Sequence, residues 1–181
     1  MRWINFLFII LALFIFSCDV TVPPEEFDNP LDEEEQNNNG VDTPALVFFP
    51  DEVTINIGFA ADVQVFALGL DNLAGAHVIV KYDKTKLELL GVTEGDFFSS
   101  AAQTMFISED DPTTGTLDIY YTYLGGDSTA VNGTGALAIL QFATSLGGQS
   151  ILRYDNSSEF ADPDDIPIVI AGFGEGVINA Q

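Results

Sequence analysis

The chain has 181 residues, and its 28 aspartates and glutamates against 5 lysines and arginines give a formal net charge of −23. A surface of this sign repels phosphate backbones, which excludes nucleic acid as a partner. Apolar residues make up 47% of the chain and 15 residues are phenylalanine, which is enough to fill the interior of one domain and excludes a chain that is disordered throughout.

The first 18 residues are typical of an export signal. Arg2 provides a positive charge ahead of an apolar run at residues 6–16, and this run is shorter than the roughly 20 residues of a membrane-spanning helix. Ser17 and the only cysteine of the chain, Cys18, follow the run and resemble a bacterial lipobox, in which the cysteine carries the lipid and becomes the mature N-terminus. The alternative is an ordinary secretory signal with an incidental cysteine. We expect a signal peptide, lipidation of Cys18, and an exported protein that is lipid-anchored to the bacterial envelope or cell surface.

Residues 19–44 differ in composition from the apolar run. Prolines occur at 23, 24 and 30, acids occupy 32–35, and the polar stretch 36–40 follows, with few apolar residues and no cation. Like charges repel one another and prolines block strand pairing, so the composition predicts a disordered acidic tether. Such a tether would hold the folded part away from a membrane.

Residues 45–181 alternate apolar segments with turn signals such as those at 71–72, 125–126, 132–133 and 147–148. No long window keeps a helical period, and the spacing of the turns is typical of an all-β fold, a two-sheet antiparallel β-sandwich. The predicted strands are 45–49, 52–57, 61–68, 76–82, 87–93, 104–108, 116–124, 136–143, 150–154, 166–170 and 176–179.

Several short motifs occur in this part of the chain in a characteristic order. A strand that ends in Tyr82-Asp83 leads through a short turn into Leu87-Glu88. The motifs that follow are Gly-Asp-Phe-Phe at 95–98, Gly-Thr-Leu at 115–117, Gly-Thr-Gly-Ala-Leu-Ala at 133–138 and Gly-Glu-Gly-Val-Ile at 174–178. In order and spacing they resemble the cohesin family over residues 45–180. The resemblance implies a jelly-roll topology with about nine strands, related to carbohydrate-binding modules, and a sheet face that binds dockerin modules, which carry their own calcium.

Alternation along the strands predicts a partner-binding face. In 76–82 the core side takes Val78 and Val80, so the intervening side chains turn outward. The same argument turns Tyr120 outward in 116–124, and matching the family turns Leu137, Ile139 and Gln141 outward in 136–143. Grouped apolar side chains on a sheet face are typical of a binding surface. The alternative is that a loop covers these residues, or that the assignment of inward and outward positions is shifted by one residue, which would exchange the two faces. The predicted face consists of His77, Ile79, Lys81, Tyr120, Thr122, Leu137 and Ile139.

Three classes of function remain open. The favoured hypothesis is a non-catalytic module, without catalytic residues or cofactor, that docks dockerin-bearing proteins of polysaccharide degradation. The second is carbohydrate binding, although the tyrosines at 120, 121 and 123 alternate around one strand and cannot form a coplanar row. The third is a structural envelope lipoprotein without dockerin binding, which Gly75 favours because many dockerin-binding cohesins have asparagine there. The acidic turns at 110–111 and 162–165 lack the spacing of a calcium loop, so we expect any calcium to be carried by the partner.

Overall fold

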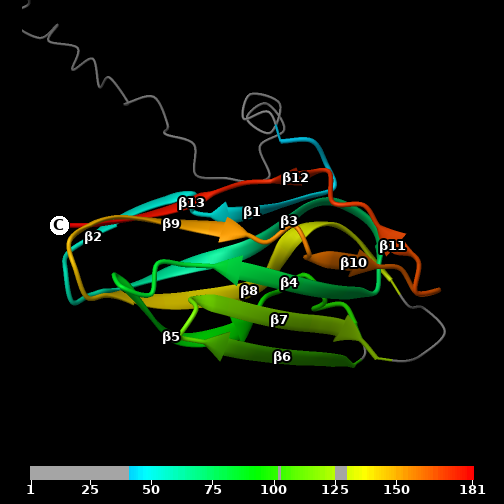
Figure 1. The fold of residues 1–181 in the computed structure, drawn as a ribbon. Coiled ribbons are helices and arrows are strands. Elements are labelled where there is room, and N and C mark those ends of the chain that lie inside the picture. Colours follow the sequence, from blue (N-terminus) through cyan, green and yellow to red (C-terminus); the bar gives the residue numbers. More distant parts are fainter. Residues whose placement is uncertain (1–40, 102, 125–129) are drawn as a thin grey trace, which may run out of the picture.

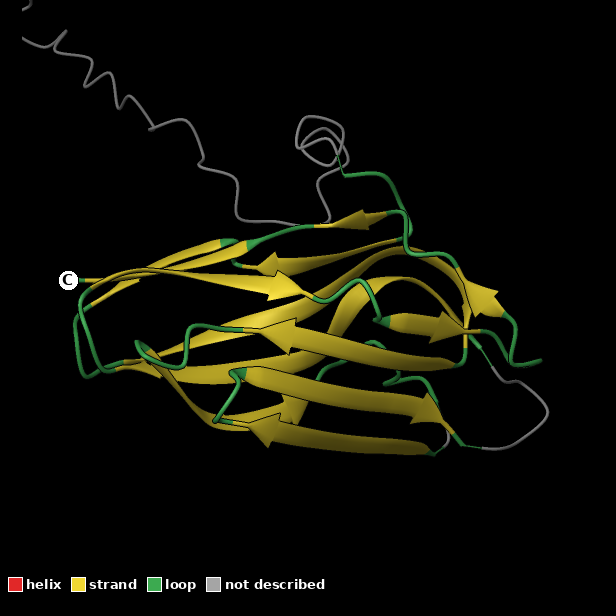
Figure 2. Ribbon diagram, in the orientation of Figure 1, coloured by secondary structure: helices red, strands yellow, loops and turns green. Residues whose placement is uncertain are grey.

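The computed structural model describes residues 41–101, 103–124 and 130–181, which form thirteen strands and no helix (Figures 1 and 2). None of these residues belongs to a helix that is long and apolar enough to span a bilayer. The predicted export signal, the lipidation of Cys18 and most of the predicted tether lie outside the described residues.

The first sheet has five strands in the order β12-β1-β3-β8-β5. These are β12 (Gly172–Phe173), β1 (Ala45–Phe49), β3 (Ala60–Leu73), β8 (Val131–Thr144) and β5 (Leu87–Glu94). Its centre is the long antiparallel pair β3 and β8, and Val63, Val65, Leu140 and Phe142 point from this pair into the core.

The second sheet is organised around β4 (Gly75–Lys81), which pairs with β7 (Thr116–Tyr123) along one edge. The strand β6 (Thr104–Asp111) continues the sheet beyond β7. Along its other edge β4 pairs first with β10 (Glu159–Ala161) and then with β9 (Gly148–Tyr154). Figure 1 shows β4, β7 and β6 side by side as the front layer of the sandwich.

The remaining strands close the second sheet. The strand β11 (Pro167–Ile168) pairs with β10, and β13 (Gly176–Ala180) lies between β9 and β2 (Glu52–Ile55). Two pairings are parallel, β1 with β12 and β2 with β13, and all others are antiparallel. The predicted all-β sandwich is confirmed. The strand number is larger than the predicted nine because the chain passes from one sheet to the other at β1–β2 and β12–β13, and because β9 and β10 are separated by a turn.

The core between the sheets confirms the predicted phase of β4 and β7. Val78 and Val80 of β4, and Leu117 and Ile119 of β7, are all buried. The aromatic rings of Phe98, Phe106 and Tyr121 meet edge to face beside them, with centroids about 5 Å apart. Since inward and outward positions alternate strictly in these strands, the phase fixes which residues face solvent.

Residues 41–44 are part of the folded unit and not of a free tether. Pro44 accepts backbone hydrogen bonds from Ala171 and Gly172. No side chain fits at position 172, because a Cβ added to Gly172 would lie only 2.6 Å from a side-chain carbon of Val41. Val41 packs against a small cluster on the outer side of the first sheet, which consists of Ala45, Phe66, Leu68 and Ala136. Residues 41–44, which precede the predicted boundary at Ala45, therefore contact the described domain.

Candidate partner-binding face

The outward side chains of β6, β7, β4 and β10 form four cross-strand rows. The register places Met105 opposite Thr122, Ile107 opposite Tyr120, Glu109 opposite Asp118, and Asp111 opposite Thr116. From β7 the rows continue across β4 to Gly75, His77, Ile79 and Lys81. Glu159 and Ala161 of β10 extend the first two of these rows. We call this surface the β4–β7 face; it passes from apolar residues at the Gly75 end to charged residues at the Lys81 end.

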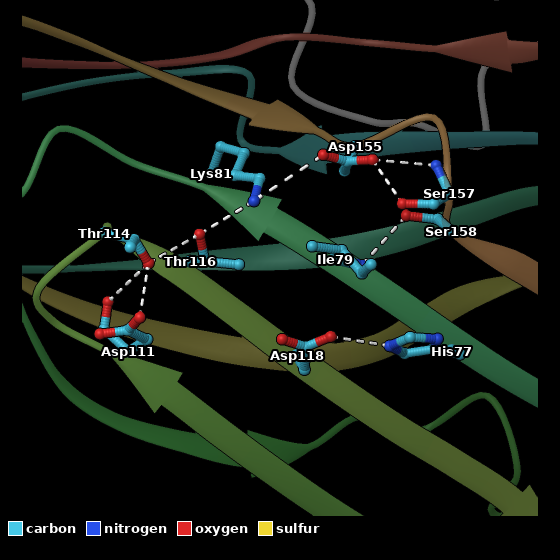
Figure 3. A network of polar contacts seen from close by, with 10 residues as sticks. All are labelled: His77, Ile79, Lys81, Asp111, Thr114, Thr116, Asp118, Asp155, Ser157 and Ser158. Atoms are coloured by element: carbon cyan, nitrogen blue, oxygen red, sulfur yellow. Dashed lines mark hydrogen bonds and ion pairs between the residues drawn. The ribbon is translucent and has the colours of Figure 1, made fainter.

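His77 and Tyr120 form the centre of the face. They are direct cross-strand partners, and their rings stack with centroids 4.3 Å apart and an interplanar angle of 10°. The Nε2 of His77 donates a hydrogen bond to a carboxylate oxygen of Asp118 at 2.8 Å (Figure 3). The imidazole is therefore held on one face by the Tyr120 ring and at Nε2 by Asp118, and Tyr120 remains partly exposed beside it.

The charged end of the face is a hydrogen-bonded chain (Figure 3). Lys81 Nζ donates to Thr116 Oγ1 at 2.9 Å and lies 3.8 Å from an oxygen of Asp155. Thr114 connects Thr116 to the carboxylate of Asp111. The hydroxyl and backbone N–H of Thr113, followed by the hydroxyl of Thr114, lower the pKa of Asp111 from 3.8 to about 2. This carboxylate is therefore ionised at every pH at which the protein would act.

The apolar end of the face is an open groove of about 700 Å³. Met105 and Tyr120 stand on one side of it, Ile168 and Val169 on the other, and Gly75 lies between them. Val169 is 77% exposed and Met105 is 41% exposed. Apolar side chains gathered around a concave surface in this way are typical of an interaction site.

Five of the seven predicted site residues share the β4–β7 face. His77, Ile79 and Thr122 are half-buried on it, and Lys81 and Tyr120 are exposed. Thr122 also donates its hydroxyl to the carbonyl of Ala74, which fixes its side chain. The partner-binding role of these five residues stays a prediction.

Leu137 and Ile139 do not lie on this face, and the prediction that they adjoin Ile79 and Tyr120 is wrong. Their strand, β8, is in the other sheet. Leu137 is completely buried, because the β3–β8 register shifts there: Val65 pairs with Ala138 but Phe66 pairs with Ala136. A β-bulge of this kind breaks the alternation and turns its extra residue toward the core. Ile139 lies on the outer side of the first sheet, opposite Gln64 and Thr93.

Sequence reasoning missed the residues that β6, β10 and the segment after β11 add to the face. These are Met105, Ile107, Glu109, Glu159 and Val169. The signal for the first three was available, because the short link 112–115 between two alternating segments predicts a hairpin and thus neighbouring strands. The three-residue strand β10 carries too little pattern to be found in this way, and the strand predicted at 166–170, which contains β11, gave no sign that it borders this face.

The geometry does not favour sugar stacking or a metal centre. Tyr121 is buried, and one face of the exposed Tyr120 ring is covered by His77, so the described part of β7 offers no row of free aromatic rings. Within the described ranges, no group of three or more histidine, cysteine, aspartate or glutamate side chains is arranged to hold a metal ion.

Comparison with known proteins agrees with this geometry. The family model described as "Cohesin domain" matches residues 50–166. A non-cellulosomal cohesin from the archaeon Archaeoglobus fulgidus superposes with a TM-score of 0.62 at 17% identity, over 76% of this chain and 90% of that one. A type II cohesin domain from the cellulosome of Acetivibrio cellulolyticus gives 0.64 at 18% identity, over 75% and 93%. The sixth cohesin of scaffoldin B from the same organism, solved in complex with a dockerin, gives 0.62 at 22% identity, over 76% and 98%.

The search of curated proteins finds no match to this chain. The fold and the exposed sheet face define a β-sandwich binding module. With most of its folded part matched by the family model, the chain belongs to the cohesin family, whose members are non-catalytic binding modules.

Proposed function

We propose that this protein is an envelope-anchored cohesin that docks dockerin-bearing proteins through the β4–β7 face. The observation that carries the proposal is the row Ile107, Tyr120, His77 and Glu159, which crosses four strands and is left uncovered by the described chain. Relatives of the same fold were solved in complex with dockerins, both in Acetivibrio cellulolyticus and in Clostridium thermocellum.

The composition of the face supports a protein partner. An exposed tyrosine with aliphatic neighbours and a polar rim is typical of the centre of a protein interface. The stacking and hydrogen bonding of His77 hold the centre of the face before a partner arrives, and preorganised groups lose less entropy on binding. We expect the calcium of the complex to be carried by the dockerin.

The docking proposal is tested with the chain from residue 19 onward and recombinant dockerin modules from the same organism. Isothermal titration calorimetry measures the affinity for the dockerin module, once in the presence of calcium and once in the presence of a chelator. We expect binding in calcium and a loss of at least tenfold in the Tyr120→Ala variant, because truncation of a central aromatic residue removes more than about 1.4 kcal/mol. The matched control is Ile139→Ala on the opposite sheet, which should bind like the wild type. Equal effects of the two substitutions would show that the partner uses another surface.

The proposed anchor is a lipid on Cys18, followed by the acidic tether. The 22 residues from 19 to 40 reach up to roughly 75 Å when extended, which would leave the β4–β7 face accessible beyond a lipid headgroup layer. In cells, the wild type should incorporate labelled fatty acid and sediment with membranes, and a Cys18→Ser variant should do neither. A Cys18→Ser protein that remains labelled would rule out the lipid anchor.

A further inference from the structure

The groove at the Gly75 end of the face differs in its construction from the rest of the face. Gly75 is flanked in its row by Thr122 of β7 and Ala161 of β10. An added Cβ at Gly75 would meet Thr122 Oγ1 at 3.4 Å, an ordinary contact. The backbone of β4 therefore does not require glycine here. What the glycine provides is space, because any longer side chain would extend into the groove.

The far wall of the groove is a fixed structure. It belongs to the hairpin that joins β10 to β11. One carboxylate oxygen of Asp162 accepts hydrogen bonds from the N–H groups of Asp164 and Ile166, each at 2.9 Å, and the N–H of Asp162 donates to the carbonyl of Ile166. The hairpin is joined to β4 by the hydrogen bond from the N–H of Ala74 to the carbonyl of Ala161. Ile168, which pairs with Phe160, is therefore held opposite Met105 and Tyr120 without a ligand, and Val169 follows it directly.

The rim of the groove is acidic. Glu159 and Asp165 line it, and Glu109 stands in the adjoining part of the face. All three are exposed, and none of them forms an ion pair with a cation among the described residues. The nearest positively charged side chain on the face is Lys81, which is engaged by Thr116 and Asp155. An apolar groove with unpaired carboxylates at its edge is complementary to an apolar side chain with cations beside it.

We propose that this groove receives one apolar side chain of the dockerin, flanked by lysine or arginine residues that pair with Glu159 and Asp165. The inference rests on the proposed docking function and adds the chemistry of the partner. It also gives a role to Gly75. The absence of a side chain at Gly75 leaves the space that an apolar anchor would occupy.

The test uses calcium-loaded recombinant dockerin modules of two kinds, with an exposed apolar helix residue flanked either by lysine and arginine or by aspartate and glutamate. Affinity is measured by titration calorimetry at low and at high sodium chloride concentration. We expect the basic modules to bind the wild type at least tenfold more tightly than the acidic ones, with the difference shrinking as salt screens the charges. The double variant Glu159→Gln, Asp165→Asn should remove most of the salt dependence.

The role of the groove is tested by a matched pair at one position. Gly75→Leu fills the groove and should weaken binding of the basic modules at least tenfold, whereas Gly75→Ala leaves it open and should bind within twofold of the wild type. Thermal unfolding of both variants checks that the fold is retained. Val169→Ser, on the opposite wall, should weaken binding without any change in β4.

The possible results separate this inference from the docking proposal. If binding is weakened by Ile107→Ser on the face but is unchanged in Gly75→Leu and Val169→Ser, the docking function stands and the groove inference is wrong. A preference for the acidic modules overturns the predicted partner chemistry. If no dockerin module binds the wild type, both proposals fall together.

Discussion

A single local motif recurs at the turns of this molecule: an aspartate whose carboxylate binds the residue two positions later. Asp83 accepts from both the N–H and the hydroxyl of Thr85, Asp111 does the same with Thr113, and Asp155 with Ser157. Such side chains offer the backbone a turn of defined geometry. In each case the pKa of the aspartate is lowered, first of all by the hydroxyl hydrogen bond.

The pKa of Asp111 leads to a prediction about stability at low pH. Because its folded value is near 2 and its ordinary value is 3.8, the contribution of Asp111 to stability is complete above about pH 4 and is lost as the pH falls toward 2. An Asp111→Ala variant should therefore be less stable than the wild type at pH 7, and the difference should disappear near pH 2. Urea unfolding at the two pH values measures both free energies. A difference that is constant with pH would contradict the assignment.

A second prediction concerns Leu137 and Ile139, which are separated by one residue in β8. Leu137→Ala should lower the free energy of unfolding by about 2–5 kcal/mol, because it leaves a cavity in a completely buried site. Ile139→Ala, on the half-buried outer side, should cost clearly less. Guanidinium unfolding of the two variants compares them directly. Equal costs would mean that the bulge does not direct Leu137 into the core.

At the scale of elements, two of the motifs that identified the family contact each other. Gly95 donates its N–H to the carbonyl of Leu137, and Phe97 donates to that of Ala136. In return Ala136 donates to the carboxylate of Asp96 at 3.0 Å. Residues 95–98 are therefore tied to the bulged part of β8 that holds residues 133–138. The two motifs occur together because each completes the hydrogen bonds of the other.

This contact leaves no space for a side chain at Gly95. An added Cβ would lie 2.2 Å from the carbonyl oxygen of Ala136, which belongs to backbone and cannot rotate away. Gly95→Ala should cost about 2–3 kcal/mol or more. Gly91→Ala, in the preceding strand and with no atom within 4 Å of the new Cβ, is the matched control and should change stability by less than about 0.5 kcal/mol. Chemical denaturation of both variants measures the two free energies of unfolding. Similar values would mean that the loss at Gly95 comes from replacing a glycine and not from a clash with Ala136.

The elements also show which parts of the fold the sequence could predict. The strict alternation in β4 and β7 was sufficient to assign their buried and exposed sides. The signals at Asp71-Asn72 and Asn132-Gly133 were interpreted as turns, but these residues lie within β3 and β8, where Asn72 and Gly133 take positive φ angles in an irregular part of the ladder. Turn residues and bulge residues require the same backbone freedom, so a local pattern does not distinguish them. Nor does alternation reveal which strands share a sheet, and for that reason Leu137 and Ile139 were assigned to the wrong surface.

Over the whole molecule the charges are divided unequally. Within the described ranges the cations are Lys81, Lys84, Lys86 and Arg153. Lys81 and Arg153 are cross-strand neighbours on β4 and β9, and Lys84 and Lys86 follow in the turn after β4. The groove lies at the opposite end of β4. The negative electrostatic potential is therefore expected to be strongest at the groove end, and it would steer a basic partner toward that end.

The excess of acid predicts how the whole protein behaves in solution. At neutral pH the formal charge of −23 keeps the molecules apart, and near the isoelectric point of about 4.1 this repulsion disappears. Light scattering between pH 7 and pH 4 should show a single small species at the upper end and association at the lower end. A protein that stays monodisperse through pH 4 would show that specific contacts, and not net charge, control its solubility.

The first and last strands pass between the layers together: β1 and β12 pair in one sheet, β2 and β13 in the other. A chain shortened to residues 50–166, the range matched by the family model, would lose one member or both of each of these pairs. Unpaired backbone at the margins of β3 and β9 would then be free to recruit strands from other molecules. A fragment cut at the limits of the family match would thus expose unpaired strand edges and be prone to aggregation, because residues 41–49 and 167–181 contain the strands that cover those edges.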